Sequence, residues 1–276
     1  MTKNIGNRNN PDLPQLLIIE DNPDLIIYLK SCLEDFYQIT VATNGQSGIE
    51  KAIDQIPDLV LSDVMMPEKN GFEVVEFLKN DERTSHIPIV LLTAKTDVAS
   101  KITGLKRGAD AYLPKPFYRE ELLATLEMMM ENRRRLQKHF SPTNLLIPRS
   151  AENGNGLAEV ATVEVETEFQ QEHVFLQKIR AVLEENYADF NFALPQLCDE
   201  LGMNRYQLFR KMKAISDESA SNFIRSFRME KAKLLFETTE LNVSEVADQV
   251  GYKDLAHFSK SFSKSFGVTP SEFRKQ

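Results

Sequence analysis

The segment LVLSDVMMP at residues 59–67 indicates the fold of the first half of the chain. A short run, Leu59–Ser62, closes on Asp63, and the turn-like stretch Met65-Met66-Pro67 follows. A short continuous apolar run is typical of a strand whose two faces are both covered. The Asp63 carboxylate is then expected at the carboxyl edge of a parallel sheet, where such folds bind ligands.

Three other short runs close on polar residues in the same way. Glu20 and Asp21 follow one run, Thr93 follows the next, and Lys115-Pro116 follow the last. The predicted strands lie near Leu16–Glu20, Gln38–Ala42, Leu59–Ser62, Ile89–Leu92 and Ala111–Leu113. Helical patterns lie between or after them at Pro23–Asp35, Gly45–Gln55, Gly71–Asn80, Asp97–Gly108 and Tyr118–Lys138. This alternation predicts an α/β fold, a (βα)₅ doubly wound parallel sheet of the flavodoxin-like type.

The polar residues at these strand ends suit a divalent cation and a phosphoryl group. Glu20 and Asp21 can hold Mg²⁺, which prefers a few carboxylates together with water and phosphate oxygens. The Asp63 carboxylate can attack phosphorus to form an acyl phosphate. Thr93 can donate a hydrogen bond to a phosphoryl oxygen, and Lys115 can pair with another. A cis Lys115–Pro116 peptide would help to aim that ammonium group.

Each of these residues also has a simpler interpretation. An aspartate at a strand end is commonly a turn former or a helix cap, Thr93 could cap the next helix, and Lys115 could be a solvated loop charge. The phosphoryl interpretation depends on all of them occurring together, in order and at this spacing.

Residues 15–135 resemble a response regulator receiver domain. The resemblance is carried by Ile18–Asn22, Leu61–Pro67, Gly71-Phe72, Leu92–Lys95 and Gly108–Phe117. It implies that Asp63 is the phosphoacceptor for a histidine kinase, and that Glu20, Asp21, Asp63 and the Met65 carbonyl hold Mg²⁺. It also implies that Thr93 and Tyr112 form a switch pair, with Thr93 moving toward the phosphoryl group and Tyr112 packing inward behind it.

Met65, two residues after Asp63, bears on the lifetime of the phosphorylated state. Methionine cannot orient an attacking water as an amide or a carboxylate could. We therefore expect slow self-dephosphorylation.

The last hundred residues carry an internal near-repeat. Gln196–Gly202 matches Glu245–Gly251, and each copy has a small residue, Cys198 or Ala247, four positions before the glycine. Each copy then enters a helix whose apolar residues lie four apart. A small residue where helices cross and a glycine for a turn with positive φ are typical of a helix-turn-helix unit. Two such units joined by a helical stretch, Ser219–Phe236, predict an all-α domain.

Residues 173–276 resemble the AraC/XylS-type DNA-binding domain. The resemblance is carried by Leu201–Arg205, Phe227–Leu235, Val246–Tyr252, Phe258–Phe262 and Phe266–Phe273. It implies two recognition helices in successive major grooves of double-stranded DNA. The side chains expected to face DNA are Arg205, Tyr206, Gln207 and Arg210 in the first helix, and Ala256, His257, Ser259 and Lys260 in the second. The second set is poorly suited to base readout and would mostly contact phosphates; for any one of the eight, a solvated helix face is the simpler alternative.

Composition divides the chain into a tail at 1–14, a receiver domain at 15–138, a flexible linker at 139–172 and the helical domain at 173–276. Net charge is −4 over 1–138, −5 over 139–172 and +1 over 173–276. The C-terminal part is therefore compatible with phosphate contacts, although charge alone would not suggest DNA.

Composition also predicts a protein of the cytoplasm without a membrane contact. No apolar run reaches the ~18 residues that span a bilayer, and residues 1–14 lack the apolar segment of a signal peptide. Cys32 and Cys198 lie within helical patterns, which favours two buried thiols in a reducing compartment over a disulfide.

Three functions remain open from the sequence. The first is a transcription regulator, not an enzyme, that forms a homodimer when phosphorylated. The second is the C-terminal fragment of a hybrid sensor histidine kinase, although the chain has no nucleotide-binding motif and its four histidines are scattered. The third is an adaptor whose helical domain binds protein rather than DNA.

Overall fold

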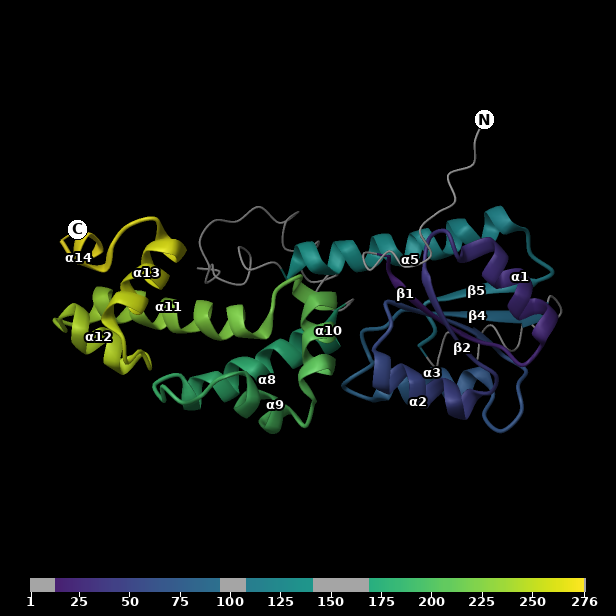
Figure 1. The fold of residues 1–276 in the computed structure, drawn as a ribbon, viewed down its shortest axis with the longest axis horizontal. Helices are drawn as coiled ribbons and strands as arrows, with labels where there is room; N and C mark the ends of the chain where they lie inside the picture. The colour runs from purple at the N-terminus through teal and green to yellow at the C-terminus, as the bar shows by residue number, and fades with distance from the viewer. Residues whose placement is uncertain (1–12, 95–107, 141–168, 276) are drawn as a thin grey trace, which may run out of the picture. The chain divides into compact units, whose positions relative to one another are not determined.

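The computed structural model describes residues 13–94, 108–140 and 169–275 (Figure 1). The chain divides into two compact units, Met1–Lys138 and His139–Gln276, which are described separately below. The predicted helix Asp97–Gly108 and nearly all of the predicted linker at 139–172 lie outside the described residues.

The first unit is built on a five-stranded parallel sheet with the order β2-β1-β3-β4-β5. The strands are β1 Gln15–Ile19, β2 Gln38–Ala42, β3 Leu59–Asp63, β4 Ile89–Ala94 and β5 Ala111–Lys115. This order reverses direction beside β1, as right-handed crossovers require in a doubly wound fold. The structure confirms the predicted flavodoxin-like sheet.

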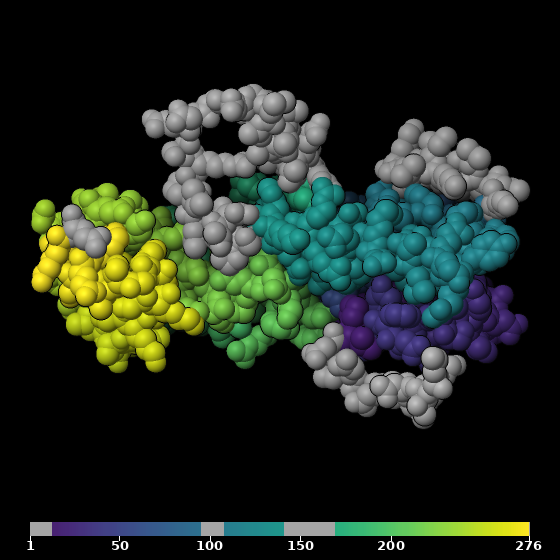
Figure 2. Space-filling model, turned by 90° about the horizontal axis from the view of Figure 1, so that it is seen from above, coloured from purple at the N-terminus to yellow at the C-terminus, as the bar shows by residue number. Residues whose placement is uncertain are grey.

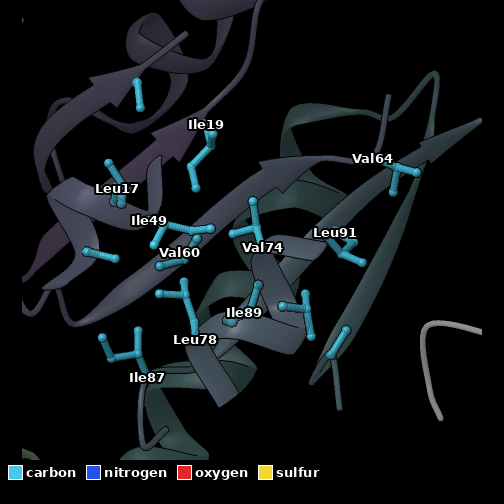
Figure 3. Close-up of a cluster of buried hydrophobic side chains, with 14 of the residues drawn as sticks. Leu17, Ile19, Ile49, Val60, Val64, Val74, Leu78, Ile87, Ile89 and Leu91 are labelled. Atoms are coloured by element: carbon cyan, nitrogen blue, oxygen red, sulfur yellow. The ribbon is translucent and has the colours of Figure 1, made fainter. Parts of the chain in front are cut away.

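Helices cover both faces of this sheet. The face covered by α1 (Pro23–Leu33) and α5 (Arg119–His139) buries Leu29, Leu122 and Leu126. The opposite face, covered by α2 (Gly45–Gln55) and α3 (Gly71–Asn80), buries the cluster drawn in Figure 3. Consecutive strand residues alternate between the two clusters, which is why the strands are apolar throughout rather than at every second position.

The ends of β4 and β5 differ from the sequence prediction. Both strands run two residues further than predicted, because Thr93 pairs with Pro114 and Ala94 with Lys115 in a parallel ladder. Lys115 is therefore the last residue of β5, and Thr93 is the next-to-last residue of β4, rather than the first residue of a loop. Strand pairing restricts the backbone of both residues at the carboxyl edge.

The second unit is entirely helical among its described residues. Its helices are α8 Gln170–Asn186, α9 Leu194–Leu201, α10 Arg205–Ser216, α11 Ala220–Thr238, α12 Val243–Gln249, α13 Leu255–Phe266 and α14 Pro270–Phe273. The first of them begins three residues before the predicted domain start.

Helices α9–α10 and α12–α13 are the two predicted helix-turn-helix units, with α11 between them. Gly202 and Gly251 adopt φ of 62° and 74°, as the turns require. Asn242 and Thr269 each cap a helix through a reciprocal pairing with the glutamate three residues on, as predicted.

Each part of the helical unit has a buried apolar interior. Phe258 and Phe262 of α13 pack against Met229 and Ala232 of α11. Both cysteines are buried and free, as expected. None of the helices in the described part of the chain has an apolar stretch sufficient to span a bilayer. The outer side of α5 is solvent-facing (Figure 2, teal).

Candidate functional site

Three carboxylates meet at the carboxyl edge of the sheet. Glu20 and Asp21 directly follow β1, and Asp63 ends β3, the strand that pairs with β1 in parallel. Side-chain oxygens of the three residues lie within 4.8 Å of one another. Glu20 and Asp63 are buried, whereas Asp21 is exposed. The cluster therefore combines two desolvated carboxylates with one that faces solvent.

One ammonium group joins this cluster from β5. Lys115 Nζ lies 2.7 Å from Asp63 Oδ1 and 3.0 Å from Glu20 Oε2. The Lys115–Pro116 peptide bond is cis. A single positive charge among three carboxylates leaves negative charge at the edge that is not balanced within the cluster.

Electrostatics at Glu20 reflect this imbalance. Burial of the side chain, and next the charge of Asp63, raise the pKa of Glu20 above its ordinary value. The Lys115 ammonium and the Asn22 backbone N–H, 3.2 Å from Glu20 Oε1, act in the opposite direction without cancelling the rise. Oxygen-only donors with surplus negative charge fit a hard divalent cation such as Mg²⁺.

Two buried hydroxyls on β4 and β5 have no hydrogen-bond partner within residues 13–94, 108–140 and 169–275. Thr93 is only 2% exposed, and among the described residues its Oγ1 has no partner. The Tyr112 hydroxyl is likewise buried and unpaired, while its ring packs against the cluster between the sheet and α2–α3. Desolvation, with a smaller contribution from Asp110, raises the pKa of Tyr112 to about 12. Both hydroxyls are thus neutral donors for which the described part of the chain supplies no acceptor.

Gly71, at the start of α3, was seen in the sequence only as part of a motif. A Cβ at this position would overlap the carbonyl oxygen of Asp63 and approach the Cα of Val64. The Gly71 backbone N–H donates to the Val64 carbonyl at 3.0 Å. Glycine therefore lets α3 begin directly against the backbone that carries Asp63.

The Met65 side chain is 76% exposed in the loop that follows Asp63. A thioether two residues from Asp63 has no hydrogen to donate and is only a weak acceptor, so it is poorly suited to orient a water molecule. Lys95, which follows Thr93 at the same spacing, lies outside the described residues.

The first recognition helix requires one correction. Gln207 was expected to face DNA, but its side chain is buried and its Oε1 accepts a hydrogen bond from the Asn204 backbone N–H at 3.0 Å. Gln207 thereby completes the N-terminal cap of α10, in exchange for the bond that Asn204 Oδ1 accepts from the Gln207 N–H. Helix periodicity shows only that Gln207 lies off the apolar stripe of α10. It does not show whether a side chain at such a position faces solvent or caps the helix.

The other expected residues of α10 lie on or near its outer face. Arg205 and Tyr206 are exposed, and Arg210 is partly buried. Phe209 and Lys213 are also exposed on this helix, although neither was among the residues expected to face DNA. Phe209 was missed because an aromatic residue between Leu208 and Met212 suggests core packing.

The second recognition helix presents its expected residues more completely. Ala256, His257 and Lys260 are exposed and Ser259 is partly buried. Asp254 caps the helix by accepting a hydrogen bond from the His257 N–H at 2.9 Å. Lys264, one turn after Lys260, is also exposed and extends this basic face.

Comparisons with known families agree with both resemblances. The family described as response regulator receiver domain matches residues 16–127, and the family described as helix-turn-helix domain matches residues 197–276.

Individual relatives match one or both parts. Histidine kinase P4 of Formosa agariphila is 35% identical over 261 residues, which is 95% of this chain and 18% of that protein. Response regulator ArlR of Staphylococcus saprophyticus is 38% identical over 129 residues, which is 46% of this chain and 56% of that protein. The solved C-terminal domain of the two-component response regulator yesN from Fusobacterium nucleatum is 36% identical. It covers 35% of this chain and 93% of its own, with a TM-score of 0.33. This chain thus spans less than two thirds of the length of histidine kinase P4 and of response regulator ArlR.

Proposed function

The chain joins a response regulator receiver domain to a C-terminal AraC-type helix-turn-helix domain, and we propose that it is a two-component regulator whose DNA binding is switched by phosphorylation of Asp63. The observation that carries this proposal is the arrangement around Asp63. A buried carboxylate lies 2.7 Å from an ammonium group and within 4.8 Å of two further carboxylates, all at the carboxyl edge of one sheet.

The proposed chemistry is phosphoryl transfer from a histidine kinase to Asp63. One Asp63 oxygen forms a bond to phosphorus while the bond between phosphorus and the imidazole nitrogen breaks, and the electron pair stays on that nitrogen. Mg²⁺ held by Glu20, Asp21, Asp63 and the Met65 carbonyl would offset the repulsion between the carboxylate and the phosphoryl donor.

Lys115 and Thr93 serve the product of this transfer. Once Asp63 carries a phosphoryl group, Lys115 pairs with a phosphoryl oxygen in place of the free carboxylate. The Thr93 hydroxyl, which has no partner among the described residues, gains an acceptor. Tyr112 follows Thr93 inward, so phosphorylation alters the surface around β4 and β5.

On the DNA side, α10 and α13 enter successive major grooves. Arg205 and Arg210 are the proposed base readers of the first helix, with Tyr206 beside them, because arginine can bind guanine through two hydrogen bonds. Ala256, His257, Ser259 and Lys260 contact mostly the backbone. Gln207 is left out of this set for the reason given above.

Coupling between the halves proceeds through dimerisation of the phosphorylated receiver domain. The sequence separates the two domains by a polar segment, and two tethered DNA modules gain affinity through effective concentration when the receiver domains pair. Release of an inhibitory contact by the receiver domain is the variant mechanism. In either case the chain is a regulator rather than an enzyme.

A second candidate function is favoured by one specific match. Histidine kinase P4 is similar to both parts of this chain at once, and the chain covers 18% of that protein. The same two domains could therefore act within a longer hybrid protein that supplies its own kinase. The proposals differ in whether the phosphoryl group arrives from a separate protein.

The decisive experiment measures DNA binding before and after treatment with acetyl phosphate and Mg²⁺. Binding to a library of genomic fragments is compared for the wild-type chain and for Asp63→Ala, across a range of salt concentrations. The proposal expects tighter specific binding after treatment and no gain for Asp63→Ala. Specific binding that is indifferent to the donor would contradict the switch, and absence of specific binding in both states would favour the adaptor.

A further inference from the structure

One arginine of α11 holds a loop that is distant in sequence. Arg228 Nε donates to the Tyr187 carbonyl at 3.0 Å. Its Nη2 donates to the carbonyls of Asp189 at 2.7 Å and Phe192 at 3.0 Å. All three acceptors belong to residues 187–193, which we call the α8–α9 loop. This loop leads directly into the first helix-turn-helix unit.

The α8–α9 loop also contacts the turn between α12 and α13, which belongs to the second helix-turn-helix unit. Gly251, in the turn between α12 and α13, has a φ of 74°, and a Cβ there would come within 2.5 Å of the Tyr187 carbonyl oxygen and 3.1 Å of Arg228 Nη2. No side chain fits between the turn and the loop. Arg228 and Gly251 thus approach the α8–α9 loop together, and the loop lies beside the α12–α13 turn (Figure 1).

Aromatic contacts extend this junction on both sides of the arginine. The Tyr187 ring packs against the buried apolar cluster of the second helix-turn-helix unit, which includes Phe258 and Phe262. Lys253 Nζ, from the α12–α13 turn, lies 3.4 Å from the centroid of the Phe190 ring, which remains 47% exposed. A cation over an aromatic face is attracted to the negative face of the ring, so this contact also joins the turn to the loop.

The positive charge of Arg228 interacts with the dipoles of backbone carbonyl groups at this junction. Burial lowers the pKa of the Arg228 guanidinium, so the surroundings disfavour its charge, and three carbonyls offset that cost. Because one guanidinium donates hydrogen bonds to three backbone carbonyls, it restricts the backbone of the α8–α9 loop directly. Lysine would keep the charge but has no planar set of donors to reach all three carbonyls.

We propose that Arg228 is a positioning residue for DNA readout, which fixes the first helix-turn-helix unit relative to the second so that α10 and α13 match sites at one spacing. This inference rests on the DNA-binding function proposed above. Major grooves on one face of DNA recur about every 34 Å, so one inserted base pair moves the second site by about 3.4 Å and turns it by about 35°. A rigid junction penalises such a shift, whereas a loose junction tolerates it.

The test begins with DNA that the wild-type chain selects from random sequence after treatment with acetyl phosphate and Mg²⁺. The selected site is then lengthened or shortened by one base pair between its two halves. Wild type should lose about tenfold or more in affinity for each change, a penalty similar to that of a mismatched base pair. Arg228→Lys should bind the best site about tenfold more weakly, with less than about threefold difference among spacings.

Arg225→Lys is the matched control. Arg225 lies one turn earlier on α11, and the structure shows its Nη2 donating to Asn222 Oδ1 within its own helix at 2.7 Å. This variant should keep the wild-type spacing preference. If Arg228→Lys keeps the wild-type spacing preference, whether or not its affinity falls equally at all spacings, the positioning role is overturned. If wild type selects no DNA, the proposed function fails instead, and that result is distinct.

A second measurement needs no DNA and covers the case in which Arg228→Lys does not fold. Spin labels at Glu200→Cys in α9 and Lys264→Cys in α13 report the distance between the two units; both positions are exposed, and the native cysteines are buried. Arg228→Lys should broaden the distance distribution, and Lys253→Ala, which removes only the contact with Phe190, should broaden it less. Unchanged width in Lys253→Ala, together with unchanged width or failure to fold in Arg228→Lys, contradicts the proposal.

Discussion

Replacing Thr93 with valine should make the unphosphorylated protein more stable while removing its response to phosphorylation. Valine has nearly the same shape as threonine, so the side chain still fills its site in β4. The hydroxyl it removes is buried and has no partner among the described residues. Burying an unpaired hydroxyl costs about 1–3 kcal/mol, so we expect the free energy of unfolding to rise by about 1–2 kcal/mol.

Thr84 provides the matched control in the same domain. It is also fully buried, but its Oγ1 donates to the Leu78 carbonyl at 2.8 Å. Thr84→Val removes a made hydrogen bond, and we expect it to lower the free energy of unfolding by about 1 kcal/mol. The two substitutions are chemically identical, so only the hydrogen bonding of the wild-type hydroxyl predicts opposite signs.

Native-state hydrogen exchange measures these changes within the full chain. The slowest amides of β3 and β4 report unfolding of the receiver domain, and about 1.4 kcal/mol changes their exchange rate tenfold. Thr93→Val should exchange more slowly than wild type and Thr84→Val faster. DNA binding by Thr93→Val should no longer respond to acetyl phosphate. If both variants exchange faster by similar factors, Thr93 has a partner in solution and the argument for a poised donor is wrong.

Phosphorylated Asp63 should persist well beyond seconds at neutral pH, as measured by the loss of labelled phosphate. Met65→Asn should shorten this lifetime by about tenfold or more, because the amide can orient an attacking water. Rapid decay in wild type that Met65→Asn leaves unchanged would contradict this prediction. The pKa of Tyr112 is raised to about 12 from an ordinary value of 10, so its contribution to stability is complete below pH 10 and is lost as the pH rises toward 12. In an ultraviolet titration the step near pH 12 should disappear in Tyr112→Phe, and its persistence would assign that pKa to another group. Gly71→Ala should lower the free energy of unfolding by about 1–3 kcal/mol, because the added Cβ overlaps the Asp63 carbonyl. Gly202→Ala is the control, since position 202 lies in open space at a φ of 62°, and it should lower the free energy of unfolding by only about 1 kcal/mol. Thermal unfolding measures both changes, and equal losses would argue against the steric cause.

Much of the fold could be predicted because its signals are local. Five short apolar runs and the helical patterns between them required the sheet, and alternation of strands with helices required parallel pairing. Gly202 and Gly251 could be assigned to turns because a glycine four residues after a small residue reports on its own backbone. The same local rule placed Glu20, Asp21 and Asp63 at strand ends, and parallel strands bring such ends to one edge.

The contacts of side chains were decided only by the tertiary structure. Sequence spacing does not show that Lys115 Nζ lies 2.7 Å from Asp63 Oδ1, because the two residues are brought together by β3, β4 and β5 in register. Helix periodicity placed Gln207 off the core, yet the cap at Asn204 took up its amide. Arg228 carries no sequence signal for its role, since its three acceptors are carbonyls, which every residue possesses. Local patterns depend on the nearest few residues, whereas a hydrogen bond between distant elements depends on how the whole domain packs, and that is the physical reason for the difference.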